Sequence, residues 1–121
     1  MRFTNDHQWL EMEGEVARVG LTAYAAQQLG DVLEVALPAR GKALRPGDAM
    51  AGVQAVRRNA DLPAPIAGEV AEVNAELFDY PDLINAGPEG AGWMLKLRPA
   101  DPKQVDGLMD RTAYEAYLSG L

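Results

Sequence analysis

The 121-residue sequence contains few side chains that could act as nucleophiles, bases or metal ligands. Cysteine is absent, so thiolate nucleophiles, thiolate zinc sites and disulfides are excluded. His7 is the single histidine, and no metal-ligand set stands beside it in the sequence. A lone histidine is more often a structural hydrogen-bonding residue than a catalyst. Because no phosphate loop, G-x-S-x-G or H-E-x-x-H motif occurs either, we predict that the protein is not an enzyme.

The basic residues offer two further kinds of chemistry, the binding of anions and the attachment of a group to an amine. Arg57 and Arg58 are adjacent and could bind an anion together, although we expect a solvated turn at this position. The lysines, which carry the only side-chain amines, are Lys42, Lys96 and Lys103.

Acidic residues outnumber basic ones, and the formal net charge is -7. Proteins that bind nucleic acid normally carry excess positive charge on one face, so we expect no nucleic-acid partner. The excess of carboxylates could instead steer the protein toward a basic surface of a partner. Glu76, Asp79 and Asp82 lie close together in the sequence, but their spacing does not match a calcium-binding loop, and we predict no metal site.

The elements that must position these residues are mostly strands. Twelve glycines and eight prolines are spread along the chain, which is typical of short strands joined by turns. Alternation of side chains predicts strands over residues 32–37 and 93–97. In the first of these strands we expect Leu33, Val35 and Leu37 to share one face.

Two helices are also predicted. Thr22 is a suitable N-cap for a helix over residues 23–29, and Gly30 is a suitable stop. A C-terminal helix is predicted over about residues 102–119, with Asp101 as its cap and Gln104 completing a capping box. The stripe along this helix that we expect to pack on the sheet consists of Val105, Leu108, Met109, Thr112 and Ala116.

A short internal similarity suggests how the strands are arranged. The sequence GEVARV at residues 14–19 recurs as GEVAEV at residues 68–73. Two strand-rich halves of this kind can bury their apolar faces against each other in a flattened barrel or sandwich. The chain length is that of one domain, and we predict a single domain over residues 1–121.

Seven segments, in order and with their spacing preserved, resemble segments of the glycine-cleavage H proteins. They are DHQWL at 6–10, VGLTAYAAQQLGD at 19–31, VALPARG at 35–41, APIAGEV at 64–70, NAELFDYPDLIN at 74–85, GWM at 92–94 and DRTAY at 110–114. The resemblance implies a lipoyl/biotinyl-like barrel-sandwich hybrid with a short helix and a C-terminal helix. It also implies a carrier whose lipoyl arm visits a pyridoxal-phosphate decarboxylase, an aminomethyltransferase and a dihydrolipoamide dehydrogenase.

One segment departs from the family pattern at the residue that matters most. The family carries its lipoyl-lysine in a segment like E-S-V-K-A-x-S-D, and the matching residues here read QAVRRNAD at 54–61, which puts Arg57 in the lysine position. Lipoylation requires an amine that can lose its proton, whereas a guanidinium keeps its proton and delocalises its lone pairs. We therefore expect Arg57 to remain unmodified and the chain to carry no lipoate. Biotin attachment needs a lysine at the same place and is excluded for the same reason.

Three functions remain open. The first is a homologue that has lost its modification and acts by binding the glycine-cleavage enzymes or a lipoylating enzyme. The second is a working carrier that is lipoylated at Lys42, Lys96 or Lys103. The third is a regulatory or structural binding module that uses the Arg57–Arg58 turn. No apolar run of about 18 residues is present, and the N-terminus does not resemble a targeting segment, so we expect a cytoplasmic protein with no membrane partner.

Overall fold

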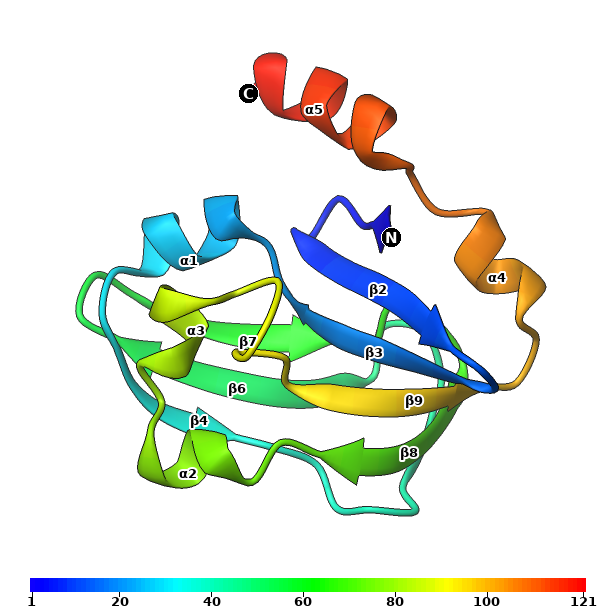
Figure 1. The fold of residues 1–121 in the computed structure, drawn as a ribbon, viewed down its shortest axis with the longest axis horizontal. Coiled ribbons are helices and arrows are strands. Elements are labelled where there is room, and N and C mark those ends of the chain that lie inside the picture. The colour runs from blue at the N-terminus through cyan, green and yellow to red at the C-terminus, as the bar shows by residue number, and fades with distance from the viewer.

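The protein is built from two antiparallel β-sheets, and the computed structural model describes all residues from 1 to 121 (Figure 1). The larger sheet has the strand order β1 (Arg2–Phe3), β2 (Gln8–Glu13), β3 (Val16–Leu21), β9 (Leu95–Pro99), β8 (Gly68–Val73) and β5 (Ala43–Leu44). The smaller sheet has the order β4 (Val32–Ala36), β6 (Ala49–Ala55) and β7 (Asn59–Pro63). The prediction of a mostly β fold is confirmed.

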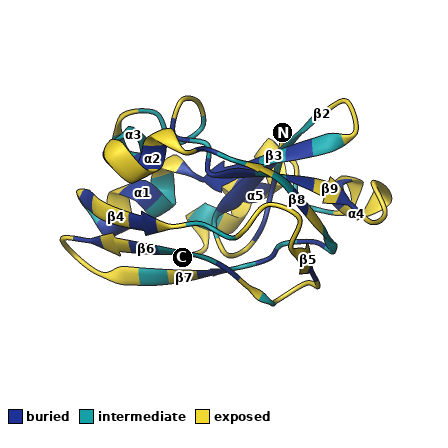
Figure 2. Cartoon of the chain, turned by 90° about the horizontal axis from the view of Figure 1, so that it is seen from below, coloured by how far each residue is buried: buried dark blue, intermediate teal, exposed yellow.

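A large hydrophobic core of 22 buried residues joins the two sheets. The larger sheet contributes Leu10, Val19, Leu95 and Leu97, all of which are at most 1% exposed. Figure 2 shows these inner faces as buried and the outer faces and turns as exposed. The core therefore forms because strand residues alternate between an inner apolar face and an outer polar face.

The two similar segments detected in the sequence lie on either side of one strand. β3 and β8, which contain most of residues 14–19 and 68–73, both pair antiparallel with β9. They are therefore the two neighbours of a shared central strand, in keeping with two related strand-rich halves that bury one core.

The strand over residues 32–37 forms, but its predicted face is wrong at one position. The register of β4 against β6 shifts between Val32 and Glu34, so that Val32 and Val35 are buried while Leu33 is 62% exposed. A β-bulge breaks the strict alternation of side chains, and apolar periodicity alone does not reveal it.

The predicted short helix is confirmed as α1 (Ala23–Leu29). The Thr22 hydroxyl accepts a hydrogen bond from the Ala25 amide at 3.3 Å, as an N-cap does. Gly30 ends the helix with a φ of 72°, in the left-handed region that glycine adopts without strain.

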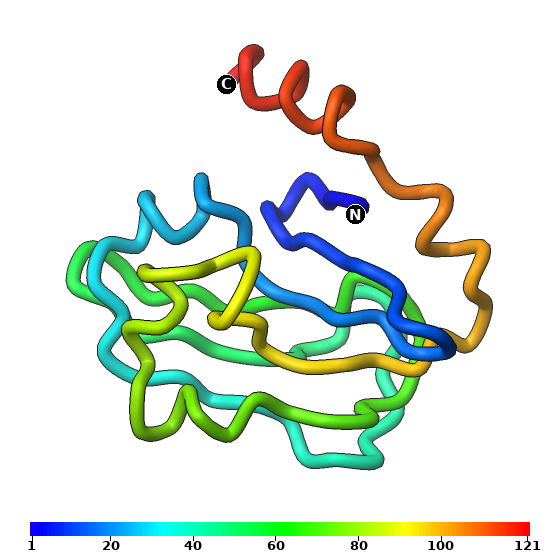
Figure 3. The backbone as a smooth tube through the Cα atoms, in the orientation of Figure 1, coloured from blue at the N-terminus to red at the C-terminus, as the bar shows by residue number.

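The C-terminal helix predicted over residues 102–119 is wrong as one element, because it is two helices, α4 (Lys103–Asp106) and α5 (Arg111–Ser119). Met109 interrupts it by exchanging two backbone hydrogen bonds with Phe3 of β1, at 2.8 and 3.1 Å. The amide and carbonyl of Met109 thus bond to a distant strand and are not available for the hydrogen bonds of a continuous helix. Figure 3 shows the resulting bend between the two helices.

The predicted caps and the predicted stripe change with that break. Asp101 accepts a hydrogen bond from the Lys103 amide, whereas Gln104 accepts one from the Ala67 amide and closes no capping box. Asp110 is the side chain that caps α5, by accepting from the Ala113 amide at 2.8 Å. Of the predicted stripe, Val105 is buried, Leu108 and Met109 are half-buried, and Thr112 and Ala116 are exposed.

Three further features complete the fold. The short helices α2 (Glu76–Asp79) and α3 (Leu83–Ala86) cover one end of the core with Leu77 and Ile84. Phe3, Trp9 and Tyr114 form a second, smaller buried cluster under α5. No helix is long and apolar enough to cross a membrane.

Candidate functional site

The candidate site is the tip of the β6–β7 hairpin. The two strands pair up to Gln54 and Asn59, and the tip connects them through Val56, Arg57 and Arg58, which are all exposed. The structure thus places Arg57 at the turn of a hairpin, where the sequence predicted it.

Three hydrogen bonds fasten the tip to the C-terminal end of α1 and to the residue just before β4. The Val56 amide donates to the Asp31 carbonyl at 2.9 Å, and the Arg57 amide donates to the Leu29 carbonyl at 3.0 Å. The Arg57 guanidinium donates to the Gln27 carbonyl at 3.2 Å. The last carbonyls of a helix lack intrahelical partners and carry partial negative charge, so a cation is favourable there. Arg57 therefore lies back along α1.

Gly30 makes room for this arrangement. A Cβ at Gly30 would lie 3.0 Å from Cγ of Arg57 and 3.2 Å from its Cδ. The positive φ therefore favours glycine at this position, and a Cβ here would in addition push the Arg57 side chain aside by a few tenths of an ångström.

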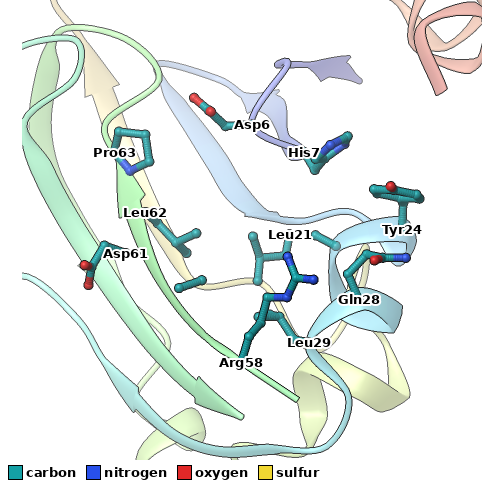
Figure 4. Close-up of a pocket in the computed structure, with 12 residues that line it drawn as sticks. Asp6, His7, Leu21, Tyr24, Gln28, Leu29, Arg58, Asp61, Leu62 and Pro63 are labelled. Carbon is teal, nitrogen blue, oxygen red and sulfur yellow. The ribbon is translucent and has the colours of Figure 1, made fainter. Parts of the chain in front are cut away.

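A cleft of about 290 Å³ lies beside the tip (Figure 4). Its walls come from the N-terminal segment, α1 and β7, and its apolar floor includes Leu21, Leu29 and Leu62. Arg58 points into this cleft, and His7 and Tyr24 lie across from it (Figure 4). The cleft is thus lined by segments that are far apart in the sequence. The Arg58 guanidinium, which has no ion-pair partner, lies within it.

Asp61 is among the residues that line the cleft, but its carboxylate is directed away from Arg58. Its Oδ1 lies 3.8 Å from the Cβ position of Gly52, on the outer face of the smaller sheet. Figure 4 shows the Asp61 side chain turned away from Arg58. The Arg58 guanidinium accordingly forms no ion pair with it.

His7 is held in the cleft wall by a network of side chains. Its Nδ1 lies 2.8 Å from the Tyr114 hydroxyl, which also lies 2.8 Å from the Thr22 hydroxyl. The His7 ring packs on the Tyr24 ring with centroids 4.5 Å apart. This network joins the N-terminal segment, the cap of α1 and helix α5.

The pKa shifts of His7 and Tyr114 indicate a structural role for this network rather than a catalytic one. Burial lowers the pKa of His7 below its usual 6.5, and the neighbouring Asp6 carboxylate opposes that shift. Burial also raises the pKa of the Tyr114 hydroxyl, which a hydrogen bond with Thr22 partly offsets. A neutral imidazole and a protonated phenol therefore form hydrogen bonds within the network that also includes the Thr22 hydroxyl. No group of three His, Asp or Glu side chains could hold a metal ion.

The lysines all lie away from the hairpin tip. Lys42 stands next to β5, and Lys103 begins α4. Lys96 on β9 is 3.4 Å from both Glu13 and Glu72, and its ammonium lies over the Trp93 ring. No side-chain amine is therefore offered at the tip.

Sequence reasoning located the tip but missed the cleft. Tyr24 and Arg58 gave no sign that they would meet across it, and His7 was interpreted only as a structural residue. The family resemblance includes the three segments that line the cleft, at residues 6–10, 19–31 and 54–61. It does not show how their side chains are arranged in space, so it could not predict the cleft.

Comparison with known proteins decides the family. The family model described as glycine cleavage H-protein matches residues 1–120. The glycine cleavage system H protein of Caulobacter vibrioides is 51% identical over 121 residues, which is all of both chains. That of Phenylobacterium zucineum is 49% identical over 119 residues, or 98% of each chain. This chain belongs to the glycine cleavage H-protein family.

A solved structure supports the family at the level of the fold. The crystal structure of a glycine cleavage system H protein from Mycobacterium marinum has a TM-score of 0.85 and 33% identity, and the match covers 98% of this chain and 95% of that one. The predicted barrel-sandwich hybrid is confirmed. The chain is an H-protein homologue, and therefore a protein of the carrier family rather than an enzyme. That Arg57 occupies the lipoyl position stays a prediction.

Proposed function

We propose that this H-protein homologue is not lipoylated and acts in glycine cleavage by binding. The observation that carries the proposal is Arg57 at the tip of the β6–β7 hairpin. In the family pattern this tip residue is the lipoyl-lysine, and a guanidinium cannot take the lysine's part in forming an amide. The side chains at the tip therefore do not fit a covalently attached lipoyl group.

The hydrogen bonds of Arg57 support the same proposal. A carrier arm must leave its attachment point freely, yet the guanidinium donates to the Gln27 carbonyl and its aliphatic part packs on Gly30. Arg57 is thus a structural residue that fastens the hairpin to α1. This structural role explains why the tip has an arginine even though no group is attached to it.

The alternative of a working carrier modified at another lysine has little support. Lys96 makes two ion pairs, with Glu13 and Glu72, which hold its ammonium against the sheet. Lys42 and Lys103 are exposed but lie on other parts of the molecule than the hairpin tip. None of them adjoins the cleft that Arg58 enters.

The proposed partners are the decarboxylase, the aminomethyltransferase and the dihydrolipoamide dehydrogenase of glycine cleavage, or an enzyme that attaches lipoate. Pull-down with each purified enzyme tests this part of the proposal. Retention of at least one of them supports binding in glycine cleavage. Retention of none would favour a regulatory or structural module outside that system, working through the Arg57–Arg58 tip.

A restoration series tests the role of the tip. Arg57→Lys restores the amine, and we expect slow modification by a lipoyl ligase with lipoate and ATP, measured by intact mass. The variant that also carries Gln54→Glu, Ala55→Ser and Arg58→Ala should be modified faster if the ligase recognises these neighbours. Arg58→Lys alone is the matched control, because it places an amine beside the acceptor position. Equal modification of Arg57→Lys and Arg58→Lys would contradict the assignment of Arg57 to the acceptor position.

A further inference from the structure

The cleft beside the hairpin tip contains a positive charge that no side chain of the protein neutralises. Among the arginines, only Arg40 and Arg58 form neither a hydrogen bond nor an ion pair. Arg40 is exposed in the turn between β4 and β5 and does not line the cleft, whereas Arg58 points into it (Figure 4). A guanidinium carries five N–H donors, so Arg58 supplies the cleft with an unused group that binds anions.

The floor of the cleft is apolar and held in place by the core. Leu21, Leu29 and Leu62 belong to the main hydrophobic core and are at most 6% exposed. The small side chains of Ala25 and Ala60 line the cleft beside them and leave its space of about 290 Å³ open. That volume is near the lower end of the range for small-molecule sites, roughly 300–1,000 Å³. The cleft therefore suits a small ligand with an apolar body.

Helix α1 adds neutral polar groups to the same cleft. The side chains of Tyr24 and Gln28 both line it (Figure 4). A phenol and an amide can each donate a hydrogen bond to an anion that a guanidinium already binds. His7 adds no second positive charge near pH 7, because burial lowers its pKa below 6.5. The cationic part of the site is thus a single guanidinium.

Nearby carboxylates limit the charge of the ligand. Asp6 and Asp61 are among the residues that line the cleft, and Figure 4 shows both carboxylates directed away from Arg58. The whole chain also carries a formal net charge of -7. A dianion such as phosphate would meet more repulsion from these charges than one guanidinium offsets. The charge balance therefore favours a ligand with one negative charge.

We propose that this cleft binds a small, free monocarboxylic acid with an aliphatic chain. Arg58 donates two parallel hydrogen bonds to the carboxylate, and the chain lies on the leucine floor. A peptide with a free C-terminus shares this chemistry, but its backbone amides and carbonyls would lie against leucines without partners. Arg57 does not line the cleft, so the proposal does not depend on whether the protein binds glycine-cleavage enzymes.

The test uses His7 as a reporter, because the only histidine of the chain gives a single imidazole Cε1–H signal from the cleft wall. Hexanoate is added to the full chain at fixed pH and ionic strength, and we expect a saturable shift of this signal. Hexanamide has the same length without the charge and should bind at least roughly tenfold more weakly. Acetate lacks the chain and should also bind at least roughly tenfold more weakly. No saturable shift with hexanoate, or equal binding of hexanamide, would overturn the proposal.

Two pairs of variants locate the ligand. Arg58→Gln should weaken hexanoate binding at least roughly tenfold, whereas Arg40→Gln, which removes the same charge elsewhere, should leave it unchanged. Ala25→Leu fills the cleft and should weaken binding, whereas Ala23→Leu at an exposed position of the same helix should not. Both leucine variants keep a good helix former in α1. Equal weakening by Arg58→Gln and Arg40→Gln would overturn the proposal, because only the net charge would then matter.

The peptide Gly-Gly-Leu separates the two sources of a carboxylate. Tighter binding of hexanoate than of this peptide supports a free acid, whereas tighter binding of the peptide would overturn that choice in favour of a protein C-terminus. The result is also independent of the enzyme pull-down. Hexanoate binding without retention of any enzyme would support the cleft site and reject the proposed function. Retention of an enzyme without hexanoate binding would reject the cleft site alone.

Discussion

At the scale of single residues, two neighbouring arginines at one hairpin tip have different roles. Arg57 lies along α1 and donates to the Gln27 carbonyl, while Arg58 points into the cleft and makes no hydrogen bond or ion pair. Their adjacency in the sequence predicts a solvated turn, with anion binding by the pair as the alternative. The difference depends on where α1 ends, at Gly30, which sequence spacing does not relate to the hairpin.

Alanine substitutions at the two arginines should therefore differ. Arg57→Ala removes a cation from the C-terminal end of α1 and should lower the free energy of unfolding by about 0.3–1 kcal/mol. Arg58→Ala should change it by less than about 0.5 kcal/mol, as is usual for a surface residue. Urea unfolding of both variants and wild type measures the difference. Equal losses would contradict the structural role of Arg57.

The shifted pKa of His7 predicts how stability depends on pH. Burial lowers the pKa of His7 in the folded state, so between that value and 6.5 the unfolded chain binds more protons. The contribution of neutral His7 is thus complete above pH 6.5 and is lost as the pH falls through that range. The groups around the ring are Asp6, Tyr24, Tyr114 and Tyr117, and Arg58 lies across the cleft from it.

Urea midpoints at about pH 7.5 and about pH 5.5 test this prediction. Wild type should lose more stability than His7→Gln over this interval, because glutamine can hydrogen-bond but does not titrate. The carboxylates are common to both proteins and cancel in the comparison. An equal loss in the two proteins would show that His7 does not titrate in a perturbed environment.

At the scale of elements, the sequence predicted those helices and hairpins whose position depends on neighbouring residues in the chain. The cap Thr22 and the stop Gly30 define α1 within one helix length, and the family pattern located the β6–β7 hairpin. The errors arose where distant segments intervene. Phe3 pairs with Met109 and divides the C-terminal helix, and a bulge against β6 turns Leu33 outward.

One buried hydroxyl contributes to the attachment of helix α5, in addition to the stacking of Tyr114 on Phe3 and the ion pair of Arg111 with Glu89. Tyr114 is 3% exposed, and its hydroxyl meets both His7 and Thr22. Tyr114→Phe should cost about 1–3 kcal/mol, because it leaves buried polar groups without a partner. Tyr117→Phe is the control, since its hydroxyl makes a single 3.4 Å contact with the Asn5 carbonyl and should cost less than about 0.5 kcal/mol. Equal thermal midpoints for the two variants would show that α5 is held by packing alone.

At the scale of the whole molecule, the chain has the H-protein fold and an uneven distribution of charge. Ion pairs cover the larger sheet, whereas the carboxylates around α2 and β4 stay free. Fold and family could be predicted from the sequence because seven ordered segments span the chain. The cleft could not, since the N-terminal segment, α1 and β7 meet only through the folding of the complete core.

The central claim is that this carrier-family scaffold carries no lipoyl group. The most direct measurement is the intact mass of the protein isolated from its own cells, together with its mass after incubation with a lipoyl ligase, lipoate and ATP. The H protein of Caulobacter vibrioides, treated in the same way, serves as the comparison substrate. We predict the unmodified mass for this chain in both samples. A lipoyl mass increment on the unaltered protein, mapped by peptide fragmentation to Lys42, Lys96 or Lys103, would contradict the claim and establish a working carrier.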